Sequence, residues 1–330
     1  MLAVILAGGL GTRLRPLTYT IPKPLLPVAN RALVEHSIAG LPREVDEVVL
    51  AVGYKAELIE EHFRHHPSPG RTVRVVIEDR PLGTGGAIAH AVREAGGTEA
   101  TFAVRNADLV DTLPMAAMLA HHRAAKALAT ISLWPVEDPS PFGVVKLSGS
   151  RIDFFVEKPK RSEAPSNLIN AGSYLLEPEV LEYVPEQPEG ELSMERVVFP
   201  ELVATSRGMQ GFTFQGHWID CGRPDSYLEA HRLLLPKGAT VAEGARHKGQ
   251  TKGFACLGPG AVVEEAAVLE DTVLLAGAHV GRGATLLRSI VGVGARVGAD
   301  AQLEDAVLGD GAEAPAGAKL RGARIPEVAA

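Results

Sequence analysis

Cysteine is scarce in this chain of 330 residues. Only Cys221 and Cys256 occur, far apart and without the spacing of a metal site. A structural disulfide is therefore not expected, and a reducing cytoplasm is the predicted compartment.

The chain also has fewer basic than acidic residues, and it lacks long apolar runs. The chain has 33 Lys and Arg against 40 Asp and Glu, a formal net charge of −7, so nonspecific nucleic-acid binding is not expected. The apolar run from Met1 to Ala7 has no basic flank and is too short for a signal peptide or a membrane span. No membrane partner is expected. The length suits one large or two modest domains.

The stretch Leu6–Lys23, LAGGLGTRLRPLTYTIPK, is the most informative part of the sequence. An apolar run that ends in a Gly-rich turn is typical of the first strand of a parallel α/β sheet, at the edge where such sheets bind ligands. Glycines allow backbone N–H groups to crowd a phosphate, and Arg13 and Lys23 add positive charge. The stretch therefore predicts a nucleoside triphosphate loop.

Two well-known phosphate loops do not fit this stretch. The Gly-Lys-Ser/Thr ending of a P-loop is absent. The dinucleotide pattern Gly-x-Gly-x-x-Gly begins at Gly9 and Gly11, but Leu14 occupies the last glycine position.

Strand and helix patterns alternate after the loop and predict a Rossmann-like, mostly parallel sheet. Expected strands are Glu47–Val52, Val73–Ile77 and Thr101–Asn106. A second Gly-rich loop, Glu78–Ala87, follows one of them. Guanine presents N–H donors that suit carboxylate or carbonyl acceptors, and Glu78 and Asp79 stand at the start of this loop.

Asp108 follows the strand that ends at Asn106 and is a natural Mg²⁺ ligand, because hard cations prefer carboxylate oxygens. Asp111 is expected to cap a helix that starts at Pro114. Short strands without helices between them, from Leu128 to Tyr174, predict an antiparallel lobe laid against the parallel sheet. Glu191–Leu202 is expected to be an amphipathic helix.

A hexapeptide pattern follows in the C-terminal part. Aliphatic residues recur every five or six positions from Leu257 through Val263, Leu269, Leu275 and Val280 to Leu320, with Gly and Ala between them. This period is the mark of a β-helix. The expected domains are an α/β domain over 1–235, a linker over 236–255 and an all-β parallel β-helix over 256–330, which resembles the left-handed hexapeptide β-helices.

Together these motifs resemble the sugar nucleotidyltransferases (nucleotide-sugar pyrophosphorylases). The family's GGxGTRLxPLT and PKP segments match the opening stretch, and segments similar to PLGTxGA, NxD, FGVV, VEKP, NAGxY and WxDxGxP follow in order. The chain looks closest to mannose-1-phosphate guanylyltransferases with a C-terminal left-handed hexapeptide β-helix. The thymidylyltransferases of this fold tend to carry a Gln in the second loop, which is missing here.

The resemblance implies transfer of a nucleotidyl group from an NTP, with GTP favoured, to a sugar 1-phosphate, giving NDP-sugar and pyrophosphate. It implies catalytic roles for Arg13 and Lys23, and an Mg²⁺ cofactor on Asp108 and Asp220. The nucleotide is expected to contact Leu6, Ala7, Gly8, Gly9, Gly11, Thr12, Glu78, Gly83, Thr84 and Gly85. The sugar phosphate is expected to contact Asp108, Gly143, Glu157, Lys158, Asn170 and Gly172.

Several alternatives stay open. Thymidylyl- or uridylyltransfer to glucose 1-phosphate is the rival reaction, and a non-catalytic regulatory or scaffold relative is the rival class. The sugar is not decided, because Glu157 and Asn170 suit gluco and manno epimers alike. The predicted β-helix range, 256–330, has a single His, His279, and no inserted loop, so it is assigned to homo-oligomer assembly or regulation rather than acyl transfer.

Overall fold

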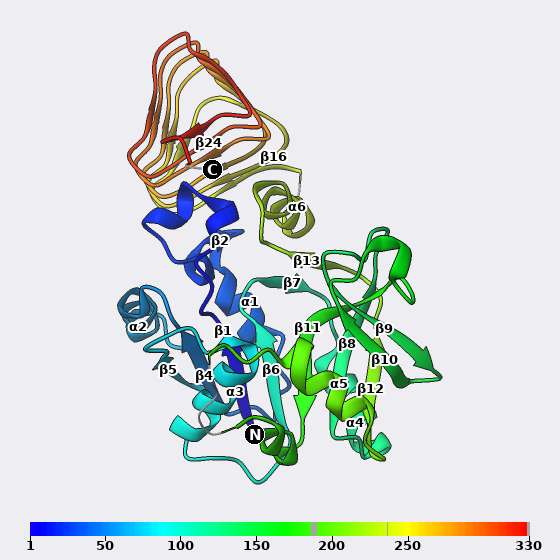
Figure 1. Cartoon of the computed structure of the whole chain (residues 1–330). Coiled ribbons are helices and arrows are strands. Elements are labelled where there is room, and N and C mark those ends of the chain that lie inside the picture. The colour runs from blue at the N-terminus through cyan, green and yellow to red at the C-terminus, as the bar shows by residue number, and fades with distance from the viewer. Residues whose placement is uncertain (186–189, 236, 329–330) are drawn as a thin grey trace. The chain divides into compact units, whose positions relative to one another are not determined.

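The computed structural model describes residues 1–185, 190–235 and 237–328 (Figure 1). The chain forms two compact units. Unit 1 contains Met1–Gly9 and Val34–Trp218, and unit 2 contains Leu10–Leu33 and Ile219–Ala330. The division differs from the predicted boundary at residue 235, because most of the opening loop groups with the C-terminal part of the chain. Within the described ranges, no helix combines the length and the apolar character needed to cross a membrane.

Unit 1 is built on one nine-stranded sheet with the order β5-β4-β1-β6-β11-β8-β12-β10-β9. Its strands are β1 Leu2–Leu6, β4 Glu47–Val52, β5 Thr72–Ile77, β6 Phe102–Asn106, β8 Ala129–Pro135, β9 Gly143–Ser148, β10 Arg151–Glu157, β11 Leu168–Leu176 and β12 Met209–Thr213. Strands β1, β4, β5 and β6 pair in parallel, as the βαβ pattern predicted. The short strand β7, Leu109–Asp111, follows β6.

The predicted antiparallel lobe is wrong in one respect: its strands extend the parallel sheet instead of lying against it. Strand β11 pairs antiparallel with β6 on one side and with β8 on the other. From Ala171 to Leu176 every residue of β11 is buried, and such a strand belongs in the middle of a sheet.

Helices and short turns cover this sheet. The α-helices are α1 Leu33–Ala39, α2 Ala56–His65, α3 Gly83–Glu94, α4 Met115–Ala125 and α5 Phe199–Val203. Shorter helices are η4 Arg161–Glu163, η5 Pro178–Tyr183 and the π-helix η6 Met194–Val198. The amphipathic helix predicted over Glu191–Leu202 is therefore a π-helical turn followed by one short α-helix.

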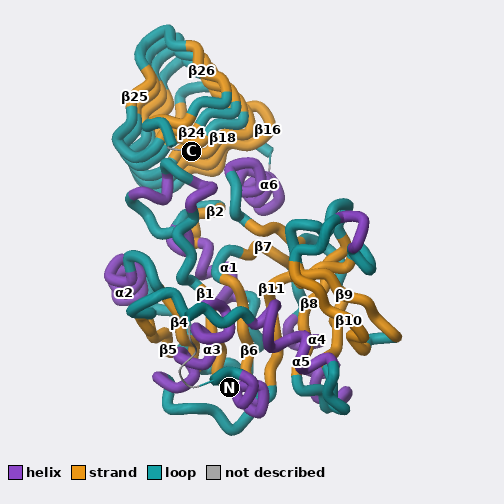
Figure 2. The backbone as a smooth tube through the Cα atoms, viewed as in Figure 1, coloured by secondary structure: helices purple, strands orange, loops and turns teal. Residues whose placement is uncertain are grey.

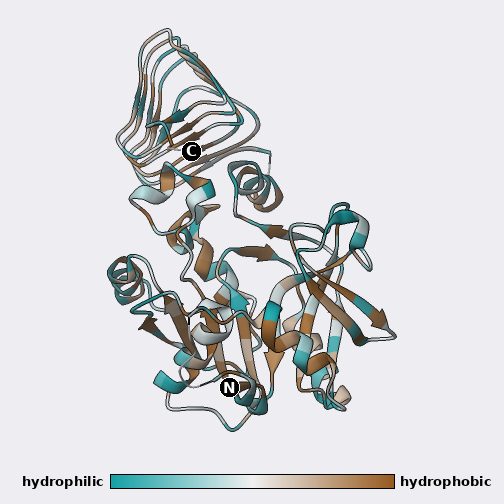
Figure 3. Ribbon diagram, in the orientation of Figure 1, coloured by the Kyte–Doolittle hydropathy of each residue, from teal (hydrophilic) through white to brown (hydrophobic). Residues whose placement is uncertain are grey.

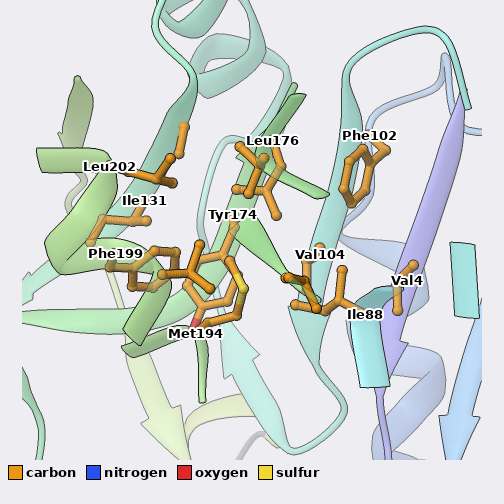
Figure 4. Close-up of a cluster of buried hydrophobic side chains, with 14 of the residues drawn as sticks. Val4, Ile88, Phe102, Val104, Ile131, Tyr174, Leu176, Met194, Phe199 and Leu202 are labelled. Carbon is orange, nitrogen blue, oxygen red and sulfur yellow. The ribbon is translucent and has the colours of Figure 1, made fainter. Parts of the chain in front are cut away.

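The core of unit 1 lies between the sheet and its helices. Figure 4 shows apolar side chains from the strands, such as Val4, Val104 and Tyr174, beside Ile88 of α3 and Phe199 of α5. The Tyr174 and Phe199 rings meet edge to face at 5.2 Å. The hydropathy colouring in Figure 3 shows the same strands as largely hydrophobic. A rigid, buried sheet is what holds the loops at its carboxyl edge in place.

Unit 2 combines the opening loop with helix α6, Pro224–Leu234, and a parallel β-helix. The loop contains η1 Thr12–Leu14, η2 Leu17–Tyr19, η3 Lys23–Leu25, β2 Pro27–Val28 and β3 Arg31–Ala32. Strand β13, Trp218–Asp220, spans the boundary with unit 1 in sequence.

The β-helix stacks short parallel strands into coils of triangular outline (Figure 1), with strands separated by turns (Figure 2). Val263 pairs with Val280 and Val280 with Val297, a step of 17 residues per coil. The strands are β14 Gly238–Val241, β15 Arg246–His247, β16 Gln250–Leu257, β17 Val262–Val263, β18 Val268–Leu274, β19 His279–Val280, β20 Thr285–Leu287, β21 Ile290–Val291, β22 Arg296–Val297, β23 Gln302–Glu304, β24 Val307–Leu308, β25 Glu313–Ala314, β26 Lys319–Arg321 and β27 Arg324–Ile325.

Two details of the predicted repeat need correction. The predicted linker over 236–255 belongs to the β-helix, since β14 pairs with β16 in parallel from Gly238 onward. Pro236, in the predicted linker, lies outside the described residues. So do Ala329 and Ala330, at the end of the predicted β-helix range. Leu274, not Leu275, aligns with Leu257 and Val291 in the stack. The five-residue step therefore precedes Leu274. Inward aliphatic residues form a core of their own.

Candidate active site

Unit 1 gathers its predicted residues at the carboxyl ends of the parallel strands. Three backbone bonds continue the strands into their loops: Ala7 N–H donates to Ala51 O at 2.9 Å, Ala107 N–H to Leu6 O at 3.0 Å, and Glu78 N–H to Val52 O at 2.8 Å. The loops that start at Ala7, Glu78 and Ala107 therefore share one edge, which is where open α/β sheets bind ligands.

Gly8 and Glu78 lie against each other at this edge. A Cβ atom added to Gly8 would stand 3.0 Å from Glu78 Oε1. The other carboxylate oxygen of Glu78 accepts the Leu82 N–H at 3.3 Å. Burial raises the pKa of Glu78, an effect that this hydrogen bond partly opposes. The structure thus places a half-buried acceptor beside the first glycine of the opening loop.

The second glycine loop is fixed by the segment around Leu192. Gly85 N–H donates to Leu192 O at 2.8 Å, and Leu192 N–H donates to Leu82 O at 2.8 Å. Gly83 has a φ of +72°, and a Cβ there would meet the Leu192 backbone at 2.5 Å, so only glycine fits this position. The loop is held in one conformation before any ligand arrives.

Glu195 is the residue that sequence reasoning missed. Its Oε2 accepts hydrogen bonds from Thr84 Oγ1 and Ser193 Oγ, both at 2.7 Å, and its Oε1 accepts one from the Tyr174 hydroxyl at 3.3 Å. Met194 N–H in turn donates to Thr84 Oγ1 at 2.8 Å. The Thr84 side chain, which was predicted to contact the nucleotide, is therefore hydrogen-bonded to Glu195 and to the Met194 backbone.

One sequence signal marks the segment that carries Glu195. Ser193 is the N-cap of the π-helix η6, and its hydroxyl accepts the Arg196 N–H at 3.2 Å. A Ser followed by an acidic residue in the first turn was readable from the sequence. The π-helical turn was not, although such turns are common at functional sites.

The predicted sugar-phosphate residues also come together in unit 1. Gly143 of β9 is the register partner of Glu157 of β10, and a Cβ on Gly143 would lie 2.9 Å from Glu157 Oε2. Lys158 Nζ lies 3.4 Å from Glu157 Oε1 and its side chain is exposed. The pKa of Glu157 is raised, first by burial and then by the negative charge of Glu195.

Asn170 links this group to Tyr174. Its Oδ1 accepts the Gly172 N–H at 3.0 Å, and its Nδ2 donates to the Tyr174 hydroxyl at 3.0 Å. These bonds use one amide hydrogen and one lone pair, and the amide has further donor and acceptor capacity for a ligand. Through Tyr174 and Glu195, the second glycine loop and the Asn170 loop belong to one hydrogen-bond network.

The turn that carries Asp108 is flanked in sequence by the two residues of a buried ion pair, Arg105 of β6 and Asp111 of β7. Arg105 Nη2 lies 2.5 Å from Asp111 Oδ2, with the two side chains 1% and 3% exposed. Burial lowers the pKa of Arg105, which Asp111 partly offsets. Asp111 also accepts the Leu113 N–H at 3.0 Å. The prediction that Asp111 caps the following helix is wrong, because its carboxylate neutralises Arg105 and α4 begins at Met115.

Unit 2 brings three other predicted residues together. Lys23 Nζ lies 3.7 Å from Asp220 Oδ1. A Cβ added to Gly222 would lie 3.0 Å from both Arg13 Nη2 and Asp220 Oδ1. Two cations and one carboxylate therefore meet, which gives the cluster a net positive charge suited to a polyphosphate.

The other predicted site residues are divided between the two units. Gly11 and Thr12 belong to unit 2 with Arg13 and Lys23, while Leu6, Ala7 and Gly9 belong to unit 1. Cys221, which follows Asp220 in the sequence, and Cys256 are both buried, and neither is part of a disulfide.

A comparison with protein-family models finds one that is described as "Nucleotidyl transferase" and matches residues 2–237. Among curated proteins, the "Mannose-1-phosphate guanylyltransferase 1" of Arabidopsis thaliana is 35% identical over 295 residues, 84% of this chain and 80% of that protein. The "Mannose-1-phosphate guanyltransferase" of Schizosaccharomyces pombe is 39% identical over 240 residues, 71% of this chain and 64% of that protein.

Solved structures agree on the fold. A crystal structure of UDP-glucose pyrophosphorylase complexed with UDP-glucose matches with a TM-score of 0.59 at 24% identity, covering 70% of this chain and 96% of that one. The family match spans the sheet, the glycine loops and the Lys23–Asp220 cluster. The chain belongs to the nucleotidyl transferase family.

Proposed function

We propose that the protein transfers a guanylyl group from GTP to mannose 1-phosphate, giving GDP-mannose and pyrophosphate. The observation that carries the proposal is the cluster of Arg13, Lys23 and Asp220, which offers a net positive charge to a polyphosphate. The names of the curated relatives supply the sugar and the base.

The reaction asks the protein for positioning and charge neutralisation rather than for a general base. An oxygen of the sugar phosphate, already anionic at neutral pH, forms a new bond to the α-phosphorus. The bond from that phosphorus to the bridging oxygen breaks, and its electron pair leaves with pyrophosphate. Arg13 holds the leaving pyrophosphate, and Lys23 neutralises the charge that develops on the α-phosphate.

Nucleotidyltransferases of this type generally use a divalent metal, and we propose Mg²⁺. Within the described ranges, no three His, Cys, Asp or Glu side chains gather into a metal site. Carboxylate donors suit Mg²⁺, which is typically held by one or two carboxylates together with substrate phosphates and water. Asp108 and Asp220 are the proposed ligands, and the ion would neutralise phosphate charge when bound.

Substrate choice is assigned to unit 1. Glu78, half-buried beside Gly8, is the proposed acceptor for the N–H donors of guanine, and Gly83 and Gly85 let the backbone approach the base. Glu157 and Asn170 are proposed to bind sugar hydroxyls, and Lys158 to neutralise the sugar phosphate. A homo-oligomer formed through the β-helix and a cytoplasmic location stay predictions.

The test is pyrophosphate release with each of ATP, GTP, CTP, UTP and dTTP, and with a panel of sugar 1-phosphates. We expect the highest kcat/KM for GTP with mannose 1-phosphate. Preference for dTTP or UTP with glucose 1-phosphate would support the rival reaction. Flat traces for every pair would favour the regulatory relative, which the intact Arg13, Lys23, Asp108 and Asp220 speak against.

A further inference from the structure

The opening loop of unit 2 is attached to the β-helix at several points along its length. Asn30 Nδ2 donates to Leu257 O, at the end of β16, at 3.1 Å. Thr20 Oγ1 donates to Asp310 Oδ2, in the turn after β24. The loop that carries Arg13 and Lys23 therefore packs on coils near the beginning and the end of the repeat.

The most direct attachment comes from Arg324, in the last described strand, β27. Its Nη1 donates to two carbonyl oxygens of the loop, Arg13 O at 3.0 Å and Arg15 O at 3.1 Å. Val307 of β24 is the register partner of Arg324, so a parallel ladder fixes its backbone.

Close packing beside Arg324 holds the same part of the loop. A Cβ added to Gly309, in the coil beneath, would stand 2.9 Å from Pro16 Cβ and 3.2 Å from Ile325 O. Only a residue without a side chain allows Pro16 to sit this close to the coil. The end of the β-helix thus touches the loop on both sides of Arg15.

The loop around Arg13 has little structure of its own. The 3-10 helix η1 spans three residues, and its internal bonds are Leu14 N–H to Gly11 O at 3.0 Å and Arg15 N–H to Thr12 O at 3.2 Å. A single such turn has poor hydrogen-bond geometry and no cooperative support. A guanidinium that binds carbonyls on both sides of Leu14 supplies the missing constraint, because charge-assisted hydrogen bonds are the strong ones.

We propose that Arg324 is a positioning residue for Arg13, so that the last coil of the β-helix sets the geometry of the pyrophosphate loop. This inference rests on the proposed role of Arg13 in holding pyrophosphate. It gives the β-helix a part in the reaction besides the assembly or regulation that the sequence favoured. The Arg324 guanidinium donates to backbone oxygens of the loop, and we assign it an action on the phosphates through Arg13.

The matched control is Arg321, three residues earlier in the same coil. Its side chain is 80% exposed and its Nε lies 3.4 Å from Glu304 Oε2, within the β-helix. Arg324→Ala and Arg321→Ala remove the same charge from neighbouring positions. Arg324→Lys keeps the charge but not the planar, rigid donor group.

The experiment measures kinetics in both directions with the full chain, in these variants and in Arg13→Ala. We expect Arg324→Ala to lose about tenfold to hundredfold in kcat, as misplacement of a binding group does, and to raise KM for pyrophosphate in the reverse reaction. KM for the sugar 1-phosphate should stay unchanged. Arg324→Lys should fall between, and Arg321→Ala should match the wild type.

A double-mutant cycle separates positioning from any other role. If Arg324 acts through Arg13, Arg324→Ala causes no further loss of kcat in the Arg13→Ala background. Equal kinetics for Arg324→Ala and Arg321→Ala, or losses that add in the cycle, would overturn the proposal.

Hydrogen exchange gives a readout that does not depend on activity. The amides of Leu14 and Arg15 should exchange faster in Arg324→Ala than in Arg321→Ala, at equal melting temperature. If the wild type transfers no nucleotide while these amides still respond, the proposed function fails and the attachment stands. If the wild type is active and the amides do not respond, the positioning role fails alone.

Discussion

Lys23 and Asp220 form an ion pair in unit 2, with Nζ 3.7 Å from Oδ1 and side chains 10% and 31% exposed. Nearly two hundred residues separate them in the sequence, and the fold of unit 2 brings them together. A separation of 3.7 Å is longer than a good charge-assisted hydrogen bond, which lies at about 2.7–2.9 Å. The Lys23 ammonium is thus held near a carboxylate, and in the proposed reaction it neutralises charge on the α-phosphate.

Lys23→Ala tests this use of the ammonium. Removal of one preorganised donor costs about 3 kcal/mol of transition-state stabilisation, so kcat should fall by about 10²- to 10³-fold. The exposed Lys319 is the control, and Lys319→Ala should behave as the wild type. Steady-state pyrophosphate release measures both variants. Near-normal turnover in Lys23→Ala would remove this residue from the mechanism.

Asp108→Asn and Asp220→Asn test the metal ligands one at a time. An amide loses the negative charge that a hard cation favours, so each variant should lose both activity and its response to added Mg²⁺. Chelation of the metal should abolish the activity of the wild type, and added Mg²⁺ should restore that activity. Mn²⁺ binding, followed by electron paramagnetic resonance, gives a readout apart from turnover. A variant that keeps its activity and its Mg²⁺ response is not missing a ligand.

Much of the α/β framework was predictable because short-range patterns determine it. The buried strand Glu47–Val52 was predicted with its observed bounds, since a short, Val-rich run between turn residues favours a buried strand over a helix. Glu157 and Gly143 were predicted from separate motifs, and the β9–β10 register places them opposite each other. The roles of Glu157 and Gly143 in binding the sugar phosphate stay predictions.

What could not be predicted depends on long-range packing. The pairing of Asp111 with Arg105 depends on how the chain turns after β6, and no local sequence pattern predicts this pairing. The grouping of the opening loop with the β-helix depends on contacts such as Arg324 with Arg13 O, 311 residues apart. The first β-helix coil was taken for a linker because its strands β14 and β15 have exposed positions and no hexapeptide pattern of buried aliphatic residues.

Asp111→Asn tests the buried ion pair between Arg105 and Asp111. Breaking a buried pair by removing one partner leaves an uncompensated charge and costs about 3–5 kcal/mol of unfolding free energy. Asp225→Asn is the matched control, because Arg223 and Asp225 form a pair with side chains 65% and 68% exposed, which is worth at most about 1 kcal/mol. Urea denaturation of the two variants gives the comparison. Equal midpoints would show that the Arg105 guanidinium is accommodated without its partner.

Glu195→Gln tests whether the glycine loop and the sugar loop are linked. The amide keeps the shape of the side chain, but its oxygen accepts less strongly from Thr84 and Tyr174 than a carboxylate does. We expect KM to rise for both the NTP and the sugar 1-phosphate, because the network holds both loops. Thr84→Val should raise mainly KM for the NTP, since it removes the hydrogen bond from Thr84 to Glu195 and leaves the one from Tyr174. A change in only the NTP constant for Glu195→Gln would contradict the link.

Glu157 gives the protein a pH dependence of stability with a definite sign. Its pKa is raised above the ordinary value of 4.5, first by burial and then by the charge of Glu195, so the folded state binds this proton more tightly than the unfolded chain does. The resulting stabilisation is fully present below pH 4.5 and is lost as the pH rises through the folded-state pKa.

Glu157→Gln should remove this loss, because an amide has no proton to release in that range. Its melting temperature should therefore vary less between acidic and neutral pH than that of the wild type, while the exposed Glu163→Gln control follows the wild type. The same variant should show a higher KM for the sugar 1-phosphate, since it has lost a strong acceptor for hydroxyls. Stability gained at neutral pH together with weaker sugar binding is the pattern expected when a buried charge is kept for function at a cost to the fold. A Glu157→Gln variant whose melting temperature follows pH as the wild type's does would show that this carboxyl is not the source of the pH dependence.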